Sequence, residues 1–140
     1  MPPAAPVPPA ASKEELEEGL RLLPRFGPDG LVTCVAQDAE TGQVVMVAHM
    51  NADALARTIE TGRAWYWSRS RGSLWLKGET SGQVQTVEDM RIDCDQDAIL
   101  LRVRIGGDGG CCHTGRPTCF YREVVLAGPE AGTLRLAQRR

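Results

Sequence analysis

The chain has 140 residues, 24% of them charged and 42% hydrophobic, and its formal net charge is −2. This length suits one domain with a buried core. The small charge gives no electrostatic attraction for nucleic acid, and no apolar run approaches the roughly 20 residues of a membrane span, so we expect neither partner. The N-terminus lacks the basic start and apolar block of a secretory signal, which predicts a cytoplasmic protein.

The first predicted elements are a flexible tail and a helix. Residues 1–11 are almost wholly Pro, Ala and Val, so we expect them to form no packed structure. Ser12 and Glu15 then make the S-x-x-E capping pattern, which predicts a helix over KEELEEGLRLL that ends before Pro24.

A second helix is predicted over ADALARTIET. Asn51 is a typical N-cap and Gly62 a typical C-terminal stop. The helical period of apolar positions predicts one buried face, made by Ala54, Leu55, Thr58 and Ile59.

The remaining pattern predicts strands that pair as hairpins. LVTCVAQD and QVVMVAHM form one pair, AWYWS and SLWL a second around Arg71-Gly72, and VQTVEDMRIDC and AILLRVRI a third. GGDGG is a loop that leads to CCHTGRPTCF, and a last strand, YREVVLA, is expected to close the domain. The sequence therefore predicts an α+β fold, a compact and mainly antiparallel β domain with two short helices, over residues 12–127, followed by a polar tail over 128–140.

The segment DCDQDAILLRV places three acids, Asp93, Asp95 and Asp97, at every second position around Cys94. Apolar residues before the acids share one strand face, and those after them share the opposite parity, which requires a turn or bulge between the two runs. Such a turn would let the three carboxylates converge.

Converging carboxylates suit a hard divalent cation such as Mg²⁺ or Ca²⁺, because its charge offsets their mutual repulsion. An EF-hand is excluded, since Ala98 stands where that loop needs Gly and Arg104 where it needs a bidentate Glu. The alternative is a solvated acidic turn, and the triplet alone does not separate the two.

Five cysteines in a chain without a secretory signal favour metal ligation or buried thiols over disulfides. The Cys112-x6-Cys119 spacing does not fit a closed zinc finger, but three thiolates, with Cys94 as the third, would leave one position of Zn²⁺ open for water. Cys34 lies in an apolar strand and is expected to be a small buried hydrophobe. Cys111 is left out of the ligand set, because adjacent residues in extended chain point apart.

A basic segment and two histidines complete the candidate residues. Arg69, Arg71 and Lys77 lie among serines and glycines, a mixture suited to binding phosphate, although a solvated hairpin has the same composition. His113 adjoins Cys112 and could shuttle protons, or it could be a surface residue. His49, in an apolar run, is expected to be structural.

The blocks WSRSRGSLWLKGETSG, DCDQDA and CHTGRPTCF, in this order, resemble the phosphoribosyl-AMP cyclohydrolase family of histidine biosynthesis across residues 24–124. The resemblance implies a hydrolase that opens the adenine ring of its nucleotide at the N1–C6 bond, with zinc activating the water. It implies an intertwined homodimer in which Cys94 joins a zinc site completed by the other subunit. Small departures from the family pattern occur at His49, Gln83, Cys111 and Thr118.

The resemblance also assigns residues to roles. The magnesium ligands would be Asp93, Asp95 and Asp97, and the zinc ligands Cys94, Cys112 and Cys119. His113 is the candidate proton carrier, and the expected substrate contacts are Arg69, Arg71, Lys77, Glu79, Thr80 and Ser81.

Two other functions remain possible at this point. A non-catalytic zinc-bridged dimeric interaction module would use the same thiols only to join two chains. A zinc nucleobase deaminase would share the chemistry of water attack on a purine carbon, but its H-x-E and P-C-x-x-C signature is absent.

Overall fold

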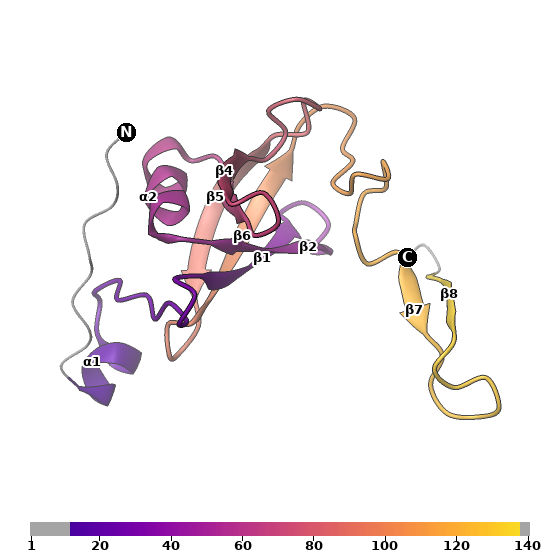
Figure 1. The fold of residues 1–140 in the computed structure, drawn as a ribbon, viewed down its shortest axis with the longest axis horizontal. Helices are drawn as coiled ribbons and strands as arrows, with labels where there is room; N and C mark the ends of the chain where they lie inside the picture. The colour runs from indigo at the N-terminus through magenta and orange to yellow at the C-terminus, as the bar shows by residue number, and fades with distance from the viewer. Residues whose placement is uncertain (1–11, 138–140) are drawn as a thin grey trace.

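Two antiparallel hairpins joined through one parallel strand pair form the central sheet of the computed structural model. β1 (Val32–Asp38) pairs with β2 (Val44–Met50), and β5 (Gln85–Ile92) pairs with β6 (Ala98–Ile105). β1 and β6 run parallel, which gives the strand order β2-β1-β6-β5 (Figure 1). Both hairpins confirm the sequence prediction, and the fold is a mixed α+β domain made mostly of strands.

The second helix and the short hairpin after it lie between the two central hairpins in the sequence. α2 (Ala52–Thr61) has the predicted Asn51 cap, whose Oδ1 accepts a hydrogen bond of 2.8 Å from the Ala54 amide. It ends at Gly62, which has a left-handed φ of 69°. The prediction for Ile59 is wrong: its side chain is 55% exposed, because the helix buries only the narrower stripe of Ala54, Leu55 and Thr58.

β3 (Trp65–Ser68) and β4 (Ser73–Leu76) form the predicted hairpin, and β3 packs against β2 and α2. The core therefore unites the sheet with this helix and hairpin. Tyr66 is its largest fully buried side chain, and the Tyr66 hydroxyl donates a hydrogen bond of 2.6 Å to Gln85 Oε1. Cys34 is fully buried in the same cluster, as the sequence predicted.

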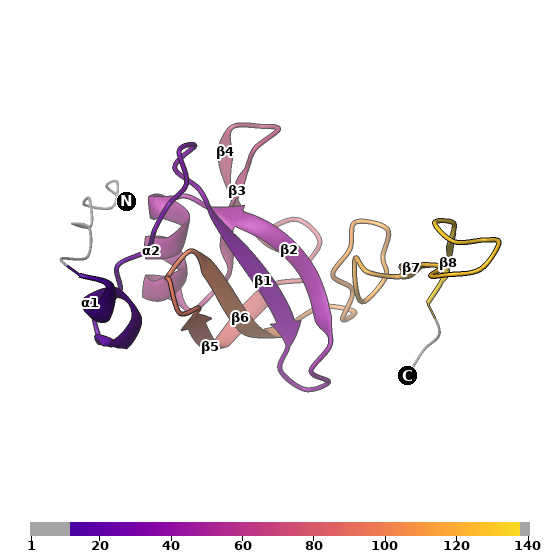
Figure 2. The ribbon, with the colours of Figure 1, turned by 90° about the horizontal axis from the view of Figure 1, so that it is seen from below.

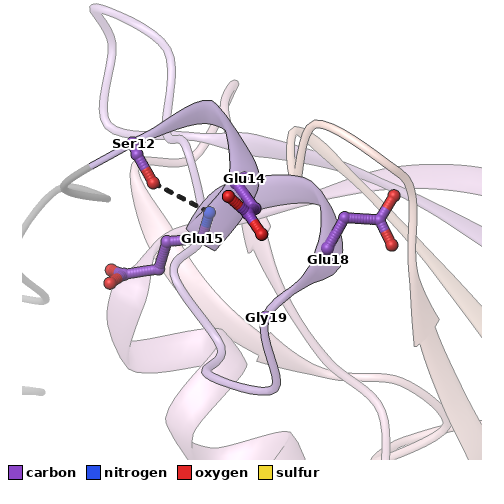
Figure 3. A pocket seen from close by; sticks show the side chains of 5 residues that line it. All are labelled: Ser12, Glu14, Glu15, Glu18 and Gly19. Carbon is purple, nitrogen blue, oxygen red and sulfur yellow. Dashed lines mark hydrogen bonds between the residues drawn. The ribbon is translucent and has the colours of Figure 1, made fainter.

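α1 (Lys13–Glu18) is shorter than the predicted helix. The Ser12 cap is present, since Ser12 Oγ accepts a hydrogen bond of 3.0 Å from the Glu15 amide (Figure 3). The helix stops at Gly19, well before Pro24, because the next backbone groups bond elsewhere: Arg21 O and Leu23 N both bond to the Gln96 side chain.

The last strand does not close the domain, which corrects that prediction. β7 (Arg122–Val124) pairs instead with β8 (Leu134–Leu136), a strand that the sequence did not indicate. Figures 1 and 2 show this hairpin, here called the C-terminal arm, extending away from the four-stranded sheet. Strand pairing with the sheet would have hidden the arm's apolar side chains, four of which are exposed: Val124, Leu126, Leu134 and Leu136.

The structure describes residues 12–137, so the flexible tail predicted at residues 1–11 falls outside it. Among the described residues no helix has the length and apolar character needed to cross a membrane.

Candidate active site

The three acids lie in the turn between β5 and β6, and one carboxylate oxygen from each of Asp93, Asp95 and Asp97 lies within 4.8 Å of the others. Ile92 pairs with Ile99 across the hairpin, so the change of parity predicted from the apolar pattern is a tight turn. Within residues 12–137 this is the only such group of three or more His, Cys, Asp or Glu side chains.

Hydrogen bonds give the acids of this turn unequal proton affinities. Asp93 Oδ1 accepts backbone amides of Asp97 at 2.9 Å and Ala98 at 3.1 Å. Partial burial raises the pKa of Asp93, but these bonds and those with neighbouring carboxyls outweigh it, so that pKa lies below its usual range. Hydrogen bonds with Asp95 and then Asp93 raise the pKa of Asp97 to about 6.

This donor set fits a hard divalent cation. It offers three oxygens that repel one another when all are ionised, on a turn where Asp93 and Asp97 are exposed to solvent. A cation among them would offset this mutual repulsion.

Two of the predicted zinc ligands come together in the loop after β6. The Cys112 and Cys119 side chains lie near enough to affect each other's proton affinity. Burial raises the pKa of Cys112, but hydrogen bonds from the Thr114 hydroxyl and amide and from Cys119 bring it below the ordinary value. Burial and the neighbouring thiols raise the pKa of Cys119 to about 12. Two thiols brought together in this way suit a soft metal, which would displace their protons on binding.

Strand β2 holds this pair in place. The Cys119 amide donates a hydrogen bond of 2.7 Å to Val45 O, and the Thr118 hydroxyl donates one of 2.9 Å to Val44 O. On the other side, the amides of Cys111 and Cys112 both donate to Arg116 O at 3.0 Å. The loop is therefore anchored to the sheet edge at one end and closed by its own turn at the other.

Cys94 does not join this pair within one chain. It is exposed in the acidic turn. Among the described residues, its sulfur does not lie within 4.8 Å of two other thiols, as a shared metal ion would require. Cys111 is 1% exposed, and its pKa is raised by burial.

The basic residues fall into two groups. Arg69 and Arg71 are exposed in the β3–β4 turn, and the Arg71 amide and Nε each lie 3.3 Å from Ser68 Oγ. Lys77 is 8% exposed, and its Nζ donates a hydrogen bond of 2.5 Å to Cys111 O. The structure therefore places Lys77 against the loop that carries Cys111, Cys112 and Cys119, here called the cysteine loop, while the two arginines are exposed to solvent.

The loop after β4 lies beside the glycine-rich loop. Position 78 must be glycine, because its φ is +84° and a Cβ there would lie 2.2 Å from the Val84 amide nitrogen. Gln83 Nε2 donates to Asp108 Oδ1 at 2.8 Å, and the same oxygen accepts the Gly110 amide at 2.9 Å. Hydrogen bonds from Gly110 and Gln83 hold the pKa of Asp108 below its usual range.

The other candidates are exposed on these loops: Glu79, Thr80, Ser81 and His113. An open hollow next to Asp97 is lined by Arg25, Phe26, Gly27, Pro28, Leu31 and Thr33. A second hollow, along α1, is lined by Ser12, Glu14, Glu15, Glu18 and Gly19 (Figure 3), and without a cationic side chain it does not suit a phosphate-bearing ligand.

Sequence reasoning missed Gln96. It lies inside the acidic triplet, yet it is only 3% exposed and has a positive φ of 57°. No local signal could have found it, because its side-chain partners lie more than 70 residues away in the chain.

The fold and site together define a small α+β enzyme domain that carries a carboxylate cluster, a thiol pair and exposed basic residues. A family model described as phosphoribosyl-AMP cyclohydrolase matches residues 46–121. The chain therefore belongs to the phosphoribosyl-AMP cyclohydrolase family, a family of hydrolases, as the sequence motifs predicted.

Curated relatives carry the same name. The chain is 63% identical over 119 residues to the phosphoribosyl-AMP cyclohydrolase of Chelativorans sp., covering 85% of this chain and 86% of that protein. It is 57% identical to that of Brucella anthropi, over 91% and 88% of the two chains, and 58% identical to that of Nitrobacter hamburgensis, over 93% and 86%.

Proposed function

We propose that the protein hydrolyses the adenine ring of phosphoribosyl-AMP at the N1–C6 bond, giving the formimino imidazole carboxamide ribonucleotide of histidine biosynthesis, and that it uses zinc and magnesium. Family membership supports the reaction. The observation that carries the metal requirement is the convergence of three carboxylate oxygens within 4.8 Å in the β5–β6 turn.

Different side chains of the chain would bind the two metals. The acid triplet would hold magnesium, and Cys112 and Cys119 would hold zinc together with the partner's Cys94. When bound, zinc would lower the pKa of a water molecule toward neutrality, and magnesium would offset negative charge on the substrate.

The exposed arginines, Arg69 and Arg71, would bind phosphate through guanidinium hydrogen bonds. His113, exposed next to Cys112, would carry a proton to the departing ring nitrogen. The loop residues Glu79, Thr80 and Ser81 would contact the rest of the nucleotide, because Gln83 and Asp108 tie their loop to the glycine-rich loop that leads to the cysteines.

Two observations support a homodimer. Cys94 lies apart from the thiols that it would need to complete a zinc site. The C-terminal arm exposes apolar side chains, with Leu126 84% and Leu136 66% exposed, and it extends from the sheet as a segment that a second copy would cover (Figure 2).

The experiment is a turnover assay with phosphoribosyl-AMP after chelation, with zinc and magnesium restored singly and together. We expect activity only when both ions are present and about one zinc per chain in the active protein. A protein with full metal content and no turnover would contradict the enzymatic proposal and favour the zinc-bridged interaction module.

A further inference from the structure

Gln96 joins the acidic turn to a segment far away in the sequence. Its Oε1 accepts the Leu23 amide at 2.6 Å, and its Nε2 donates to Leu16 O at 2.9 Å and to Arg21 O at 3.3 Å. Its backbone oxygen also accepts the Arg25 amide at 2.7 Å. All four bonds reach residues 16–25, here called the N-terminal strap.

The same residue shapes the turn itself. The Gln96 amide donates a hydrogen bond of 3.1 Å to Asp93 O, and its φ of 57° lies in the left-handed region, which residues other than Gly rarely adopt. Such a conformation persists when the surroundings fix it. Here the N-terminal strap fixes the conformation of Gln96, since both N–H donors and the oxygen acceptor of its buried side-chain amide form hydrogen bonds with strap atoms.

The strap also forms part of the site's surface. The hollow that Asp97 lines is bounded by Arg25 and Phe26, and Arg25 is held to Gln96 through its backbone amide. Movement of the strap would therefore move both the turn and the wall beside Asp97.

From these contacts we propose that Gln96 is a positioning residue for divalent-cation binding: it uses the N-terminal strap to hold the turn in the shape that brings Asp93, Asp95 and Asp97 together. This inference rests on the proposed function, since it assumes that the triplet binds a cation. The physical reason is preorganisation. A turn that is already folded does not have to be ordered by the ion, and residues that orient metal ligands typically contribute tenfold to a hundredfold in affinity.

The test uses Mn²⁺ as a paramagnetic probe, titrated by electron paramagnetic resonance into the full chain from which metals have been removed. Gln96→Asn keeps an amide and a residue type that tolerates positive φ, but is one methylene too short for the strap. Gln96→Gly removes the side chain and introduces a residue that adopts a positive φ without steric strain. Gln37→Asn makes the same shortening at an exposed amide that bonds Gly42 O, and serves as the matched control.

We expect both Gln96 variants to bind Mn²⁺ about tenfold to a hundredfold more weakly than the wild type and the control. In metal-free protein, the amides of Leu23 and Arg25 should exchange with solvent faster, together with those of Asp97 and Ala98. Thermal unfolding of each variant establishes that it is folded, and the Asn variant is the milder of the two.

Faster exchange at Leu23 with Mn²⁺ affinity within about twofold of the wild type would mean that Gln96 only anchors the strap, and would overturn the inference. A wild type that binds no Mn²⁺ at all would instead contradict the magnesium site of the proposed function, and the inference with it. The two failures are distinguished by the wild-type titration alone.

Discussion

The ammonium nitrogen of Lys77 donates a hydrogen bond of 2.5 Å to the carbonyl oxygen of Cys111, 34 residues further along the chain. The same nitrogen lies 5.4 Å from the centroid of the Trp75 ring, and the side chain is almost fully buried. A buried cation thus joins the end of β4 to the loop that carries Cys112. The sequence pattern predicted Lys77 as a substrate contact, and that role stays a prediction beside the structural one seen here.

Replacing Lys77 with Met separates the two roles, because Met keeps the length and removes the charge. The Cys111 carbonyl would lose a charge-assisted hydrogen bond, so we expect the free energy of unfolding to fall by about 1.5–3 kcal/mol. Zinc content should fall as well, because the loop holding Cys112 and Cys119 is released. Denaturant unfolding and metal analysis measure both. A variant with wild-type stability and zinc content but a raised KM would instead assign Lys77 to the substrate.

Substitutions at Asp93 and Asp97 should have different effects on stability, although both remove a carboxylate from the same cluster. Asp93→Ala removes the acceptor of two backbone amides, at 2.9 and 3.1 Å, so we expect a loss of about 1–3 kcal/mol in unfolding free energy. Asp97→Ala removes an exposed carboxyl, and its stability should stay close to that of the wild type. Both should lose magnesium-dependent turnover. Equal destabilisation of the two variants would contradict the different roles assigned to them.

Asp108→Ala should loosen the loop after β4, which carries Glu79, Thr80 and Ser81, without changing zinc content. The change removes one acceptor shared by Gln83 and the Gly110 amide. We expect the Gly110 amide to exchange faster and KM to rise more than kcat falls, whereas Asp108→Asn, which retains Oδ1 as a neutral acceptor, should show a smaller change in both.

The pH dependence of the same contact follows from the lowered pKa of Asp108. A carboxylate stabilised in its charged form contributes fully above the usual Asp range, and its contribution is lost as the pH falls through the lowered pKa. Protection of the Gly110 amide should therefore stay constant through neutral pH and decline only in acid. Loss of protection near neutrality would indicate that another group controls the loop.

The sequence was sufficient where structure depends on neighbours in the chain. Three hairpins and the second helix followed from turn residues, caps and apolar periods within short segments, such as Asn51 with Gly62. The parallel pairing of β1 with β6, the strap held by Gln96 and the burial of Lys77 join segments far apart, and nothing local specifies them. The short α1 shows the same limit, because the Gln96 side chain takes backbone groups that a longer helix would have used.

In the candidate site, too, local sequence was enough to predict one part and not the other. Alternation of acids and the change of strand parity were enough to predict that Asp93, Asp95 and Asp97 converge. The grouping of Cys112 with Cys119 rests on the hydrogen bond that docks Cys119 to β2 and on the turn that Cys112 makes with Arg116, and no spacing rule contains the first of these.

Thiol labelling should distinguish metal ligands from buried cysteines. Burial raises the pKa of Cys34 to about 12, so its thiolate is absent at neutral pH and it should react only after unfolding. In zinc-loaded protein we expect Cys94, Cys112 and Cys119 to be protected, and chelation should make the exposed Cys94 reactive, whereas Cys119, whose pKa is raised to about 12, should still react slowly. Alkylation followed by mass spectrometry identifies each position. A Cys94 thiol that is alkylated equally fast with and without zinc would contradict the proposed ligand set.

Mixed dimers test whether the zinc site is shared between subunits. Cys94→Ala and Cys112→Ala should each give an inactive protein. If Cys94 of one subunit serves the thiol pair of the other, a hybrid of the two variants has one site that lacks both residues and one site that is intact. Half of the dimers in a fully exchanged equal mixture are hybrids, so we expect about a quarter of the wild-type specific activity to return.

The same mixture also distinguishes the alternatives. A zinc site built within one chain would give no recovery, because each subunit would keep its own defect in every dimer.

Recovery should also require subunit exchange, so variants mixed without unfolding and refolding should regain activity only as fast as dimers dissociate. Substituting Leu126 and Leu136 on the C-terminal arm with Ser should speed that exchange, since these exposed side chains would be the ones covered by the partner. Activity that appears at once on mixing, or that is insensitive to the arm, would contradict the assignment of the arm to the dimer interface.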